Sequence, residues 1–139
     1  MKYIISVPNG TYEAVSESDF NQTLTDLDYE DIPVLKVTTE CDLFLFSGRH
    51  EMPTWIDGVI FKDAVENPSN LEEIRESAKS GLLPWISGMG IDHVNIYVTG
   101  LTPALIESIN LCHKYGTKVT LYHFNRETGK YFPQEVERW

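Results

Sequence analysis

The chain has 139 residues, 42% of them hydrophobic, which predicts one domain, over residues 1–139, with a packed core. Its 21 acidic residues outnumber its 11 basic ones, and the net charge of −10 disfavours binding to long nucleic acids or an anionic membrane. No apolar run approaches the roughly 20 residues that span a bilayer, and the apolar start is too short for a signal peptide. We therefore expect a cytoplasmic protein without membrane partners, in which a local basic pocket can still hold a small anion.

The first third of the chain alternates apolar and polar segments. Residues 2–7 predict a strand that a turn at residues 8–10 closes. The acidic segment 11–31 predicts either a short helix that starts at Ser16 or Ser18, or an irregular excursion. Residues 33–38 predict a short strand. The continuous apolar run 42–46 is typical of a strand buried on both faces, as in a parallel sheet.

The middle of the chain predicts a short strand at residues 58–61 and a turn at 67–70. A helix then starts at Ser69 or Asn70, continues to about Lys79 and ends at Gly81. The apolar residues 82–86 are expected to pack as a flap or to contact another subunit.

The last third predicts strand, helix, strand and hairpin. A strand over residues 94–98 precedes a helix over 103–115, with Thr102 as the N-cap and an apolar face that includes Leu105, Ile106, Ile109 and Cys112. Residues 118–124 form the next strand of a βαβ unit, and Glu127-Thr128-Gly129 turns the chain into a closing antiparallel strand. The whole predicts a Rossmann-like, three-layer α/β domain with a mainly parallel sheet and a C-terminal β-hairpin.

Two apolar strands each end in a hydroxyl residue followed by glycine. In a parallel sheet both turns lie at the carboxyl edge, where ligands of open α/β sheets bind and where a helix N-terminus favours anions. The expected ligand-binding residues are Ser47, Gly48, Arg49, Thr99, Gly100 and Thr102. The alternative is structural: Gly100 only makes the turn, Thr102 only caps the helix, and Arg49 pairs with a nearby carboxylate such as Glu51.

Catalytic residues are not identified by any motif, and the candidates are His123, Arg126 and Arg49. The first two lie at or beyond the end of the strand 118–124, where His123 can act as an acid or base near neutral pH. The alternative is that His123 only forms a hydrogen bond within its strand. The sequence contains no dinucleotide, phosphate-loop or nucleophile-elbow motif, and no metal or cofactor is expected. The two cysteines, Cys41 and Cys112, are expected to be buried free thiols.

The segment 94–124 resembles the core of CARF-type Rossmann domains, the ligand sensors of CRISPR antiviral systems. The resemblance rests on a buried strand followed by Thr99-Gly100-Leu101-Thr102 at the start of a helix, with Leu101 where the family commonly has a second glycine. It implies a homodimer that binds a nucleotide-derived signal, such as a cyclic oligoadenylate, at its two-fold interface, and some members cleave that ligand.

Three functions follow from these features. The first is a ligand-binding protein that recognises a small anionic or nucleotide-derived molecule. The second is a protein–protein adaptor from a phage or mobile element, whose contact surface would include residues 82–86, Tyr131, Phe132 and Trp139. The third is a metal-independent ring nuclease or another phosphodiesterase at the same site.

Overall fold

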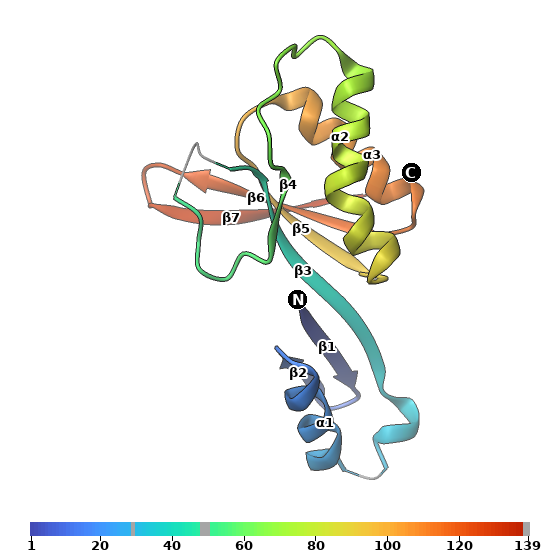
Figure 1. Cartoon of the computed structure of the whole chain (residues 1–139). Coiled ribbons are helices and arrows are strands. Elements are labelled where there is room, and N and C mark those ends of the chain that lie inside the picture. The colour runs from blue at the N-terminus through green and yellow to red at the C-terminus, as the bar shows by residue number, and fades with distance from the viewer. Residues whose placement is uncertain (29, 48–50, 138–139) are drawn as a thin grey trace. The chain divides into compact units, whose positions relative to one another are not determined.

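The computed structural model describes residues 1–28, 30–47 and 51–137 of the chain (Figure 1). It contains two compact units, Met1–Glu40 and Cys41–Trp139. Strand β3 (Lys36–Phe46) begins in the first unit and ends in the second. The expectation of one domain over the whole chain stays a prediction.

The first unit is built on a β-hairpin. Strand β1 (Lys2–Val7) and strand β2 (Gly10–Ala14) pair antiparallel, and Val7 faces Gly10 across a two-residue turn. The predicted strand and turn are confirmed. Strand β2 was not predicted, because most of its residues are polar or small and lie exposed, so no apolar alternation marks them. On its other edge, β1 pairs antiparallel with the first residues of β3.

One helix packs on this hairpin. Helix α1 (Glu17–Asp26) starts at Ser16, whose hydroxyl accepts a hydrogen bond from the backbone N–H of Asp19 at 3.1 Å. This confirms the first of the two helix starts that the sequence allowed. The ring of Phe20 lies 4.8 Å from that of Tyr3, yet no residue of α1 is fully buried. The core of this unit is therefore thin.

The sequence predicted two strands where the structure has one. Residues Ile32–Val34 form a 3₁₀ turn (η1), and β3 then continues without interruption to Phe46. The polar residues 38–40 belong to the strand because β1 supplies their backbone partners. The sequence predicted a break in the strand here because these residues are not apolar, but the pairing with β1 keeps them in the strand.

The second unit combines a five-stranded sheet with two helices. In addition to β3 its strands are β4 (Gly58–Phe61), β5 (His93–Tyr97), β6 (Lys118–Asn125) and β7 (Lys130–Val136), in the order β4-β3-β5-β6-β7. Strands β5 and β6 are parallel, and β6 and β7 form an antiparallel hairpin. Both the predicted βαβ unit and the predicted C-terminal hairpin are confirmed.

Helices α2 (Leu71–Leu83) and α3 (Thr102–Lys114) pack against each other and cover the sheet (Figure 1). An ion pair between Arg75 and Glu107, 3.1 Å apart, joins them at the surface. Beneath them lies the core, in which fully buried side chains come from sheet and helices alike: Leu43, Leu45, Ile60, Ile74, Leu82, Val94 and Ile96.

Helix α2 continues beyond Gly81, the residue that was expected to end it. A Cβ atom on Gly81 would lie 1.9 Å from the carbonyl oxygen of Ile60. This glycine therefore allows the helix to approach β4, and it does not mark a helix end. The helix leads into a π-helical turn, η2 (Pro84–Gly88), in which Ile86 is buried. The predicted flap at residues 82–86 is thus wrong for Leu82 and Ile86, which belong to the core.

Helix α3 differs from its prediction in two details. Its N-cap is Leu101, without a side-chain cap, so the prediction that Thr102 caps the helix is wrong. The buried face contains the small residues Ala104 and Ser108, whereas Ile106 is half exposed. Small side chains allow α2 and α3 to pack closely, and this overrides the apolar pattern of the helix.

The expected fold class, a mainly parallel Rossmann-like domain of three layers, is wrong. The described strands form a mixed sheet of seven strands with three helices. The antiparallel ladders β1/β2, β1/β3 and β6/β7 contain most of the paired residues, while β3/β4 and β5/β6 are parallel. Apolar runs such as residues 43–46 predicted parallel strands correctly for the second unit only.

Candidate functional site

The ends of β3 and β5 lie side by side. The hydroxyl of Thr99 accepts a hydrogen bond from the backbone N–H of Phe46 at 3.0 Å and donates one to the carbonyl of the same residue at 3.2 Å. The two turns that follow these strands therefore start next to each other. Thr99 is buried, and its hydroxyl is used within the fold and is not presented to a ligand.

The other predicted ligand-binding residues lie around this point. Ser47 is exposed, and its hydroxyl donates a 3.4 Å hydrogen bond to the carbonyl of Lys62. Gly100 has a positive φ of 95° and makes the turn, and Thr102 is exposed in the first turn of α3. Gly48 and Arg49 lie outside the described residues.

A cavity of about 170 Å³ opens at the carboxyl edge of the sheet. Ser47 lines it from the connection after β3, residues 62–65 from the connection after β4, and Leu101 from the turn after β5. Lys62 and Asp63 supply one charge of each sign. The cavity therefore lies where three adjacent strands end, which is the usual ligand position in open α/β sheets.

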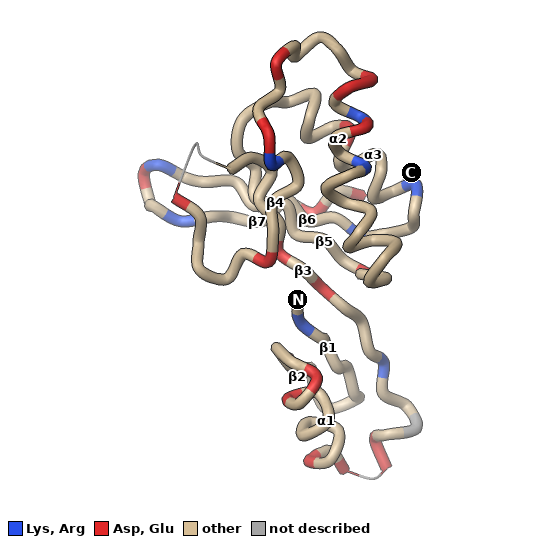
Figure 2. The backbone as a smooth tube through the Cα atoms, in the orientation of Figure 1, with Lys and Arg blue, Asp and Glu red and all other residues tan. Residues whose placement is uncertain are grey.

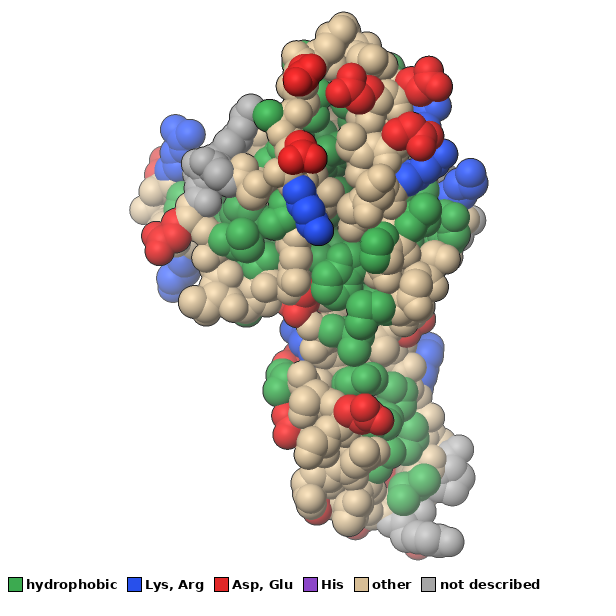
Figure 3. All heavy atoms as spheres, viewed as in Figure 1, with side chains coloured by type: hydrophobic (Ala, Val, Ile, Leu, Met, Phe, Trp, Pro, Cys, Tyr) green, Lys and Arg blue, Asp and Glu red, His purple; other side chains and the backbone are tan. Residues whose placement is uncertain are grey.

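A larger cavity of about 630 Å³ lies between β4, the connection after it and α2. Its lining includes Lys62 together with the acidic residues Asp63, Glu66, Glu73 and Glu76. Figure 2 marks acidic residues along α2 and the connection that leads to it, and Figure 3 shows acidic side chains over the same part of the molecule. This excess of carboxylates makes the larger cavity unfavourable for an anion.

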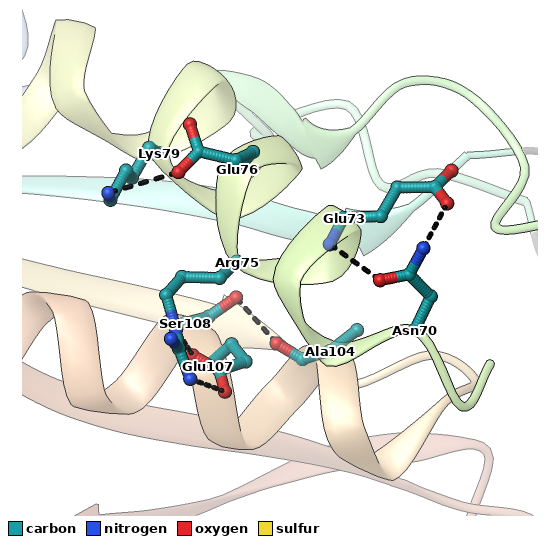
Figure 4. A network of polar contacts seen from close by, with 8 residues as sticks. All are labelled: Asn70, Glu73, Arg75, Glu76, Lys79, Ala104, Glu107 and Ser108. Atoms are coloured by element: carbon teal, nitrogen blue, oxygen red, sulfur yellow. Dashed lines mark hydrogen bonds and ion pairs between the residues drawn. The ribbon is translucent and has the colours of Figure 1, made fainter. Parts of the chain in front are cut away.

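Two of these carboxylates already have partners on their own helix (Figure 4). Glu73 closes a capping arrangement: its backbone N–H donates to Asn70 Oδ1 at 3.2 Å, and its carboxylate accepts from Asn70 Nδ2 at 3.3 Å. Glu76 pairs with Lys79 at 3.2 Å. These contacts stabilise the first turns of α2 and need no ligand.

The candidate acid–base residue is held by its neighbouring strand. His123 Nε2 lies 2.8 Å from Gln134 Oε1 on β7, and its ring centroid lies 5.3 Å from that of Phe132. This bond joins two neighbouring strands and is not one within the strand of His123, and the acid–base role of His123 stays a prediction. Arg126 is exposed in the turn between β6 and β7, and neither residue is among those that line the cavity at Ser47.

A cluster of aromatic residues was not predicted from the sequence: Trp55, Tyr97, Tyr122, Phe124 and Tyr131. The rings of Tyr97 and Tyr122 stack at 4.9 Å, and Tyr131 meets Tyr97 edge to face at 5.0 Å. The indole N–H of Trp55 donates to the hydroxyl of Tyr97 at 2.8 Å. Burial raises the pKa of Tyr97 to about 12. The signal in the sequence was the spacing of two between Tyr122 and Phe124, which puts both on one face of a strand.

Burial disfavours the reactive thiolate form of both cysteines. Cys41 and Cys112 are both buried free thiols, as expected. Burial raises the pKa of Cys112 to about 12 and the pKa of Cys41 further. Within the described ranges, no three His, Cys, Asp or Glu side chains are grouped so that they could hold a metal ion.

No helix of the described residues is both long and apolar enough to cross a membrane. Comparisons with known proteins found no matching family model, no similar curated protein and no similar solved structure. The resemblance of residues 94–124 to CARF-type domains therefore stays a prediction from the sequence.

Proposed function

We propose that this chain is a binding protein for a small molecule with one anionic group, such as a mononucleotide, held in the cavity at Ser47, Lys62 and Leu101. The observation that carries the proposal is that this cavity is lined by the connections after three adjacent strands. Lys62 supplies the positive charge, and the first turn of α3 follows Leu101 directly.

The size of the cavity limits what part of a ligand it can hold. At about 170 Å³ it is smaller than the roughly 300–1,000 Å³ of sites that enclose a whole drug-sized molecule. It therefore accepts one group of the ligand, a phosphate or a sugar. The acidic lining of the neighbouring cavity repels further phosphates, so the proposal favours a ligand with a single phosphate over a cyclic oligoadenylate with several.

Isothermal titration calorimetry tests this function with adenosine monophosphate, inorganic phosphate and a cyclic tetra-adenylate as probes. We expect the mononucleotide to bind more tightly than the cyclic compound. Replacing Lys62 with alanine removes a charged contact and should weaken binding at least about tenfold. The matched control is Lys130→Ala, on the exposed start of β7.

The result that would overturn the proposal is the absence of heat and of a thermal shift with all three probes. Equal binding by Lys62→Ala and Lys130→Ala would place any anion site elsewhere. Both variants change an exposed or cavity-lining lysine, so each is expected to fold.

A second candidate function, the protein–protein adaptor, is supported by the aromatic cluster. Trp55 is 56% exposed and Phe124 is 47% exposed, and aromatic side chains are enriched in protein interfaces. Phe132, predicted as contact surface, is also half exposed, whereas Trp139 lies outside the described residues. Leu82 and Ile86 are buried and do not form such a surface.

A pull-down from the native host lysate tests the adaptor function. Phe124→Ala should reduce the capture of a stoichiometric partner at least about tenfold if this surface binds it. Met89→Ala is the control, because Met89 is similarly exposed but follows η2 and does not belong to the aromatic cluster. Equal capture by both variants would contradict the adaptor function at this surface.

A further inference from the structure

Strand β2 has an edge that no described strand covers. It is a terminal strand of the sheet, and it pairs with β1 on its other side. Val7 and Gly10 are the pair that closes a two-residue hairpin, so they exchange both backbone hydrogen bonds. By the alternation of an antiparallel ladder, Tyr12 also bonds to β1, whereas Thr11 and Glu13 direct their N–H and C=O groups outward.

Strand β7, at the other end of the order that starts with β2, has two protective features that β2 lacks. Strand β7 carries Pro133 in its middle and Lys130 at its start, two features that discourage the addition of another strand. Strand β2 contains neither proline nor lysine. An open edge of this kind is a template for pairing with another chain.

Several large apolar side chains of the first unit are exposed. Tyr12 is 45% exposed, Val15 70% and Val34 61%. Within this unit of forty residues, α1 buries no side chain completely. Units of this size commonly need a partner to reach useful stability.

We propose that β2 is a dimerisation edge at which two copies of this chain pair β2 against β2, antiparallel, about a two-fold axis at Tyr12. This register sets Thr11 of one copy opposite Glu13 of the other, so all four outward-directed backbone groups of each strand form hydrogen bonds. It also sets Gly10 opposite Ala14, and Tyr12 opposite its own equivalent.

This register also avoids a clash of like charges. A pairing centred on Glu13 would bring two carboxylates together, and like charges directly opposite each other destabilise a sheet. In the register about Tyr12, each Glu13 faces a threonine hydroxyl that can donate to it. Lys2, 3.7 Å from Glu13, reduces the negative charge at the interface.

The remaining obstacle is the charge of the unit. Residues 1–40 contain eight acidic residues and two lysines, so two copies repel each other. At about 0.15 M salt this repulsion is screened beyond roughly 8 Å. Added salt should therefore strengthen the dimer, in contrast to an interface held by opposite charges.

Disulfide trapping tests the register on the full chain. In the proposed dimer, residue 12 faces its own equivalent as a non-hydrogen-bonded pair, at a Cα separation of about 4.5 Å that a disulfide can span. Tyr12→Cys should form a covalent dimer under mild oxidation. Thr11→Cys should not, because its equivalent lies diagonally across the axis. Both native cysteines are buried and do not compete.

Sedimentation over micromolar to millimolar protein concentrations tests the interface without a new thiol. Thr11→Pro removes an outward N–H that β1 does not use, and it should raise the dimer dissociation constant at least about tenfold. Thr11→Ala keeps the N–H and should dimerise like the original chain. Circular dichroism of Thr11→Pro checks that the unit still folds.

Three results would overturn the proposal. One is a monomer at every concentration, and another is equal trapping by Tyr12→Cys and Thr11→Cys. The third is a dimer that persists unchanged in a folded Thr11→Pro. The outcome does not depend on whether the cavity at Ser47 binds a nucleotide.

Discussion

Thr99 shows how one side chain holds two strand ends together. Its hydroxyl both accepts from and donates to the backbone of Phe46, at 3.0 and 3.2 Å. A hydrogen bond of this kind contributes on the order of 1 kcal/mol to stability. Because both partners are buried, water cannot replace the bonds when the hydroxyl is removed.

We therefore expect Thr99→Val to lower the free energy of unfolding by about 2 kcal/mol, measured by urea denaturation. Thr102→Val is the control, because Thr102 is exposed and should change stability by less than about 0.5 kcal/mol. Equal effects of the two substitutions would show that the Thr99 hydroxyl has no structural role.

The roles of individual residues were predictable where local chemistry decides them. Ser16 caps α1, and Gly129, in the predicted turn before the closing strand, has a positive φ of 68°. Local sequence could not distinguish Thr99 from Thr102, because both flank the same glycine. The difference arises from Phe46, a residue 53 positions earlier in the chain.

At the scale of elements, the backbones of α2 and β4 approach each other closely at Gly81. The Cβ position of Gly81 is 1.9 Å from a backbone oxygen of β4, which cannot move independently of its strand. A glycine inside a helix ordinarily costs about 1 kcal/mol relative to alanine. At this position the close approach of helix and strand reverses that preference.

Gly81→Ala should accordingly destabilise the protein by about 1–3 kcal/mol, because α2 must move away from β4. Thermal unfolding followed by circular dichroism measures the change. Gly88→Ala is the matched control: the nearest atom to its Cβ position lies 3.7 Å away, an ordinary contact. Stabilisation by Gly81→Ala would contradict so close an approach of helix and strand.

Most elements were predictable from periodicity and turn residues, and the failures have physical causes. Strand β2 lacks apolar alternation and is held by its pairing with β1. The inner face of α3 is set by the small residues Ala104 and Ser108, where α2 approaches. In both cases a neighbouring element decides what the local pattern leaves open.

At the scale of the whole chain, local patterns predicted the parallel ladders of the second unit but not the mixed sheet. The run 43–46 is parallel to β4, as its apolar character indicates. The same strand, β3, pairs antiparallel with β1 through its earlier residues. No local feature of a strand specifies two partners of opposite direction, so the fold class was predicted incorrectly.

The candidate site depends on the same long-range pairing. The sequence located the turns after β3 and β5, but the cavity also needs residues 62–65 after β4, which carry no recognisable motif. Lys62 was therefore missed, although it is the basic residue among the described residues that line the cavity. Nothing in the sequence of the two turns indicates that residues 62–65 complete the cavity.

The bond between Phe46 and Thr99 also sets an order of events during protein synthesis. A ribosome that adds about 5–20 residues per second needs roughly 3–10 s to proceed from one residue to the other. Throughout that interval the end of β3 has been synthesised without its later neighbour. Premature release of the nascent chain before residue 99 would leave an apolar strand exposed to chaperones and proteases.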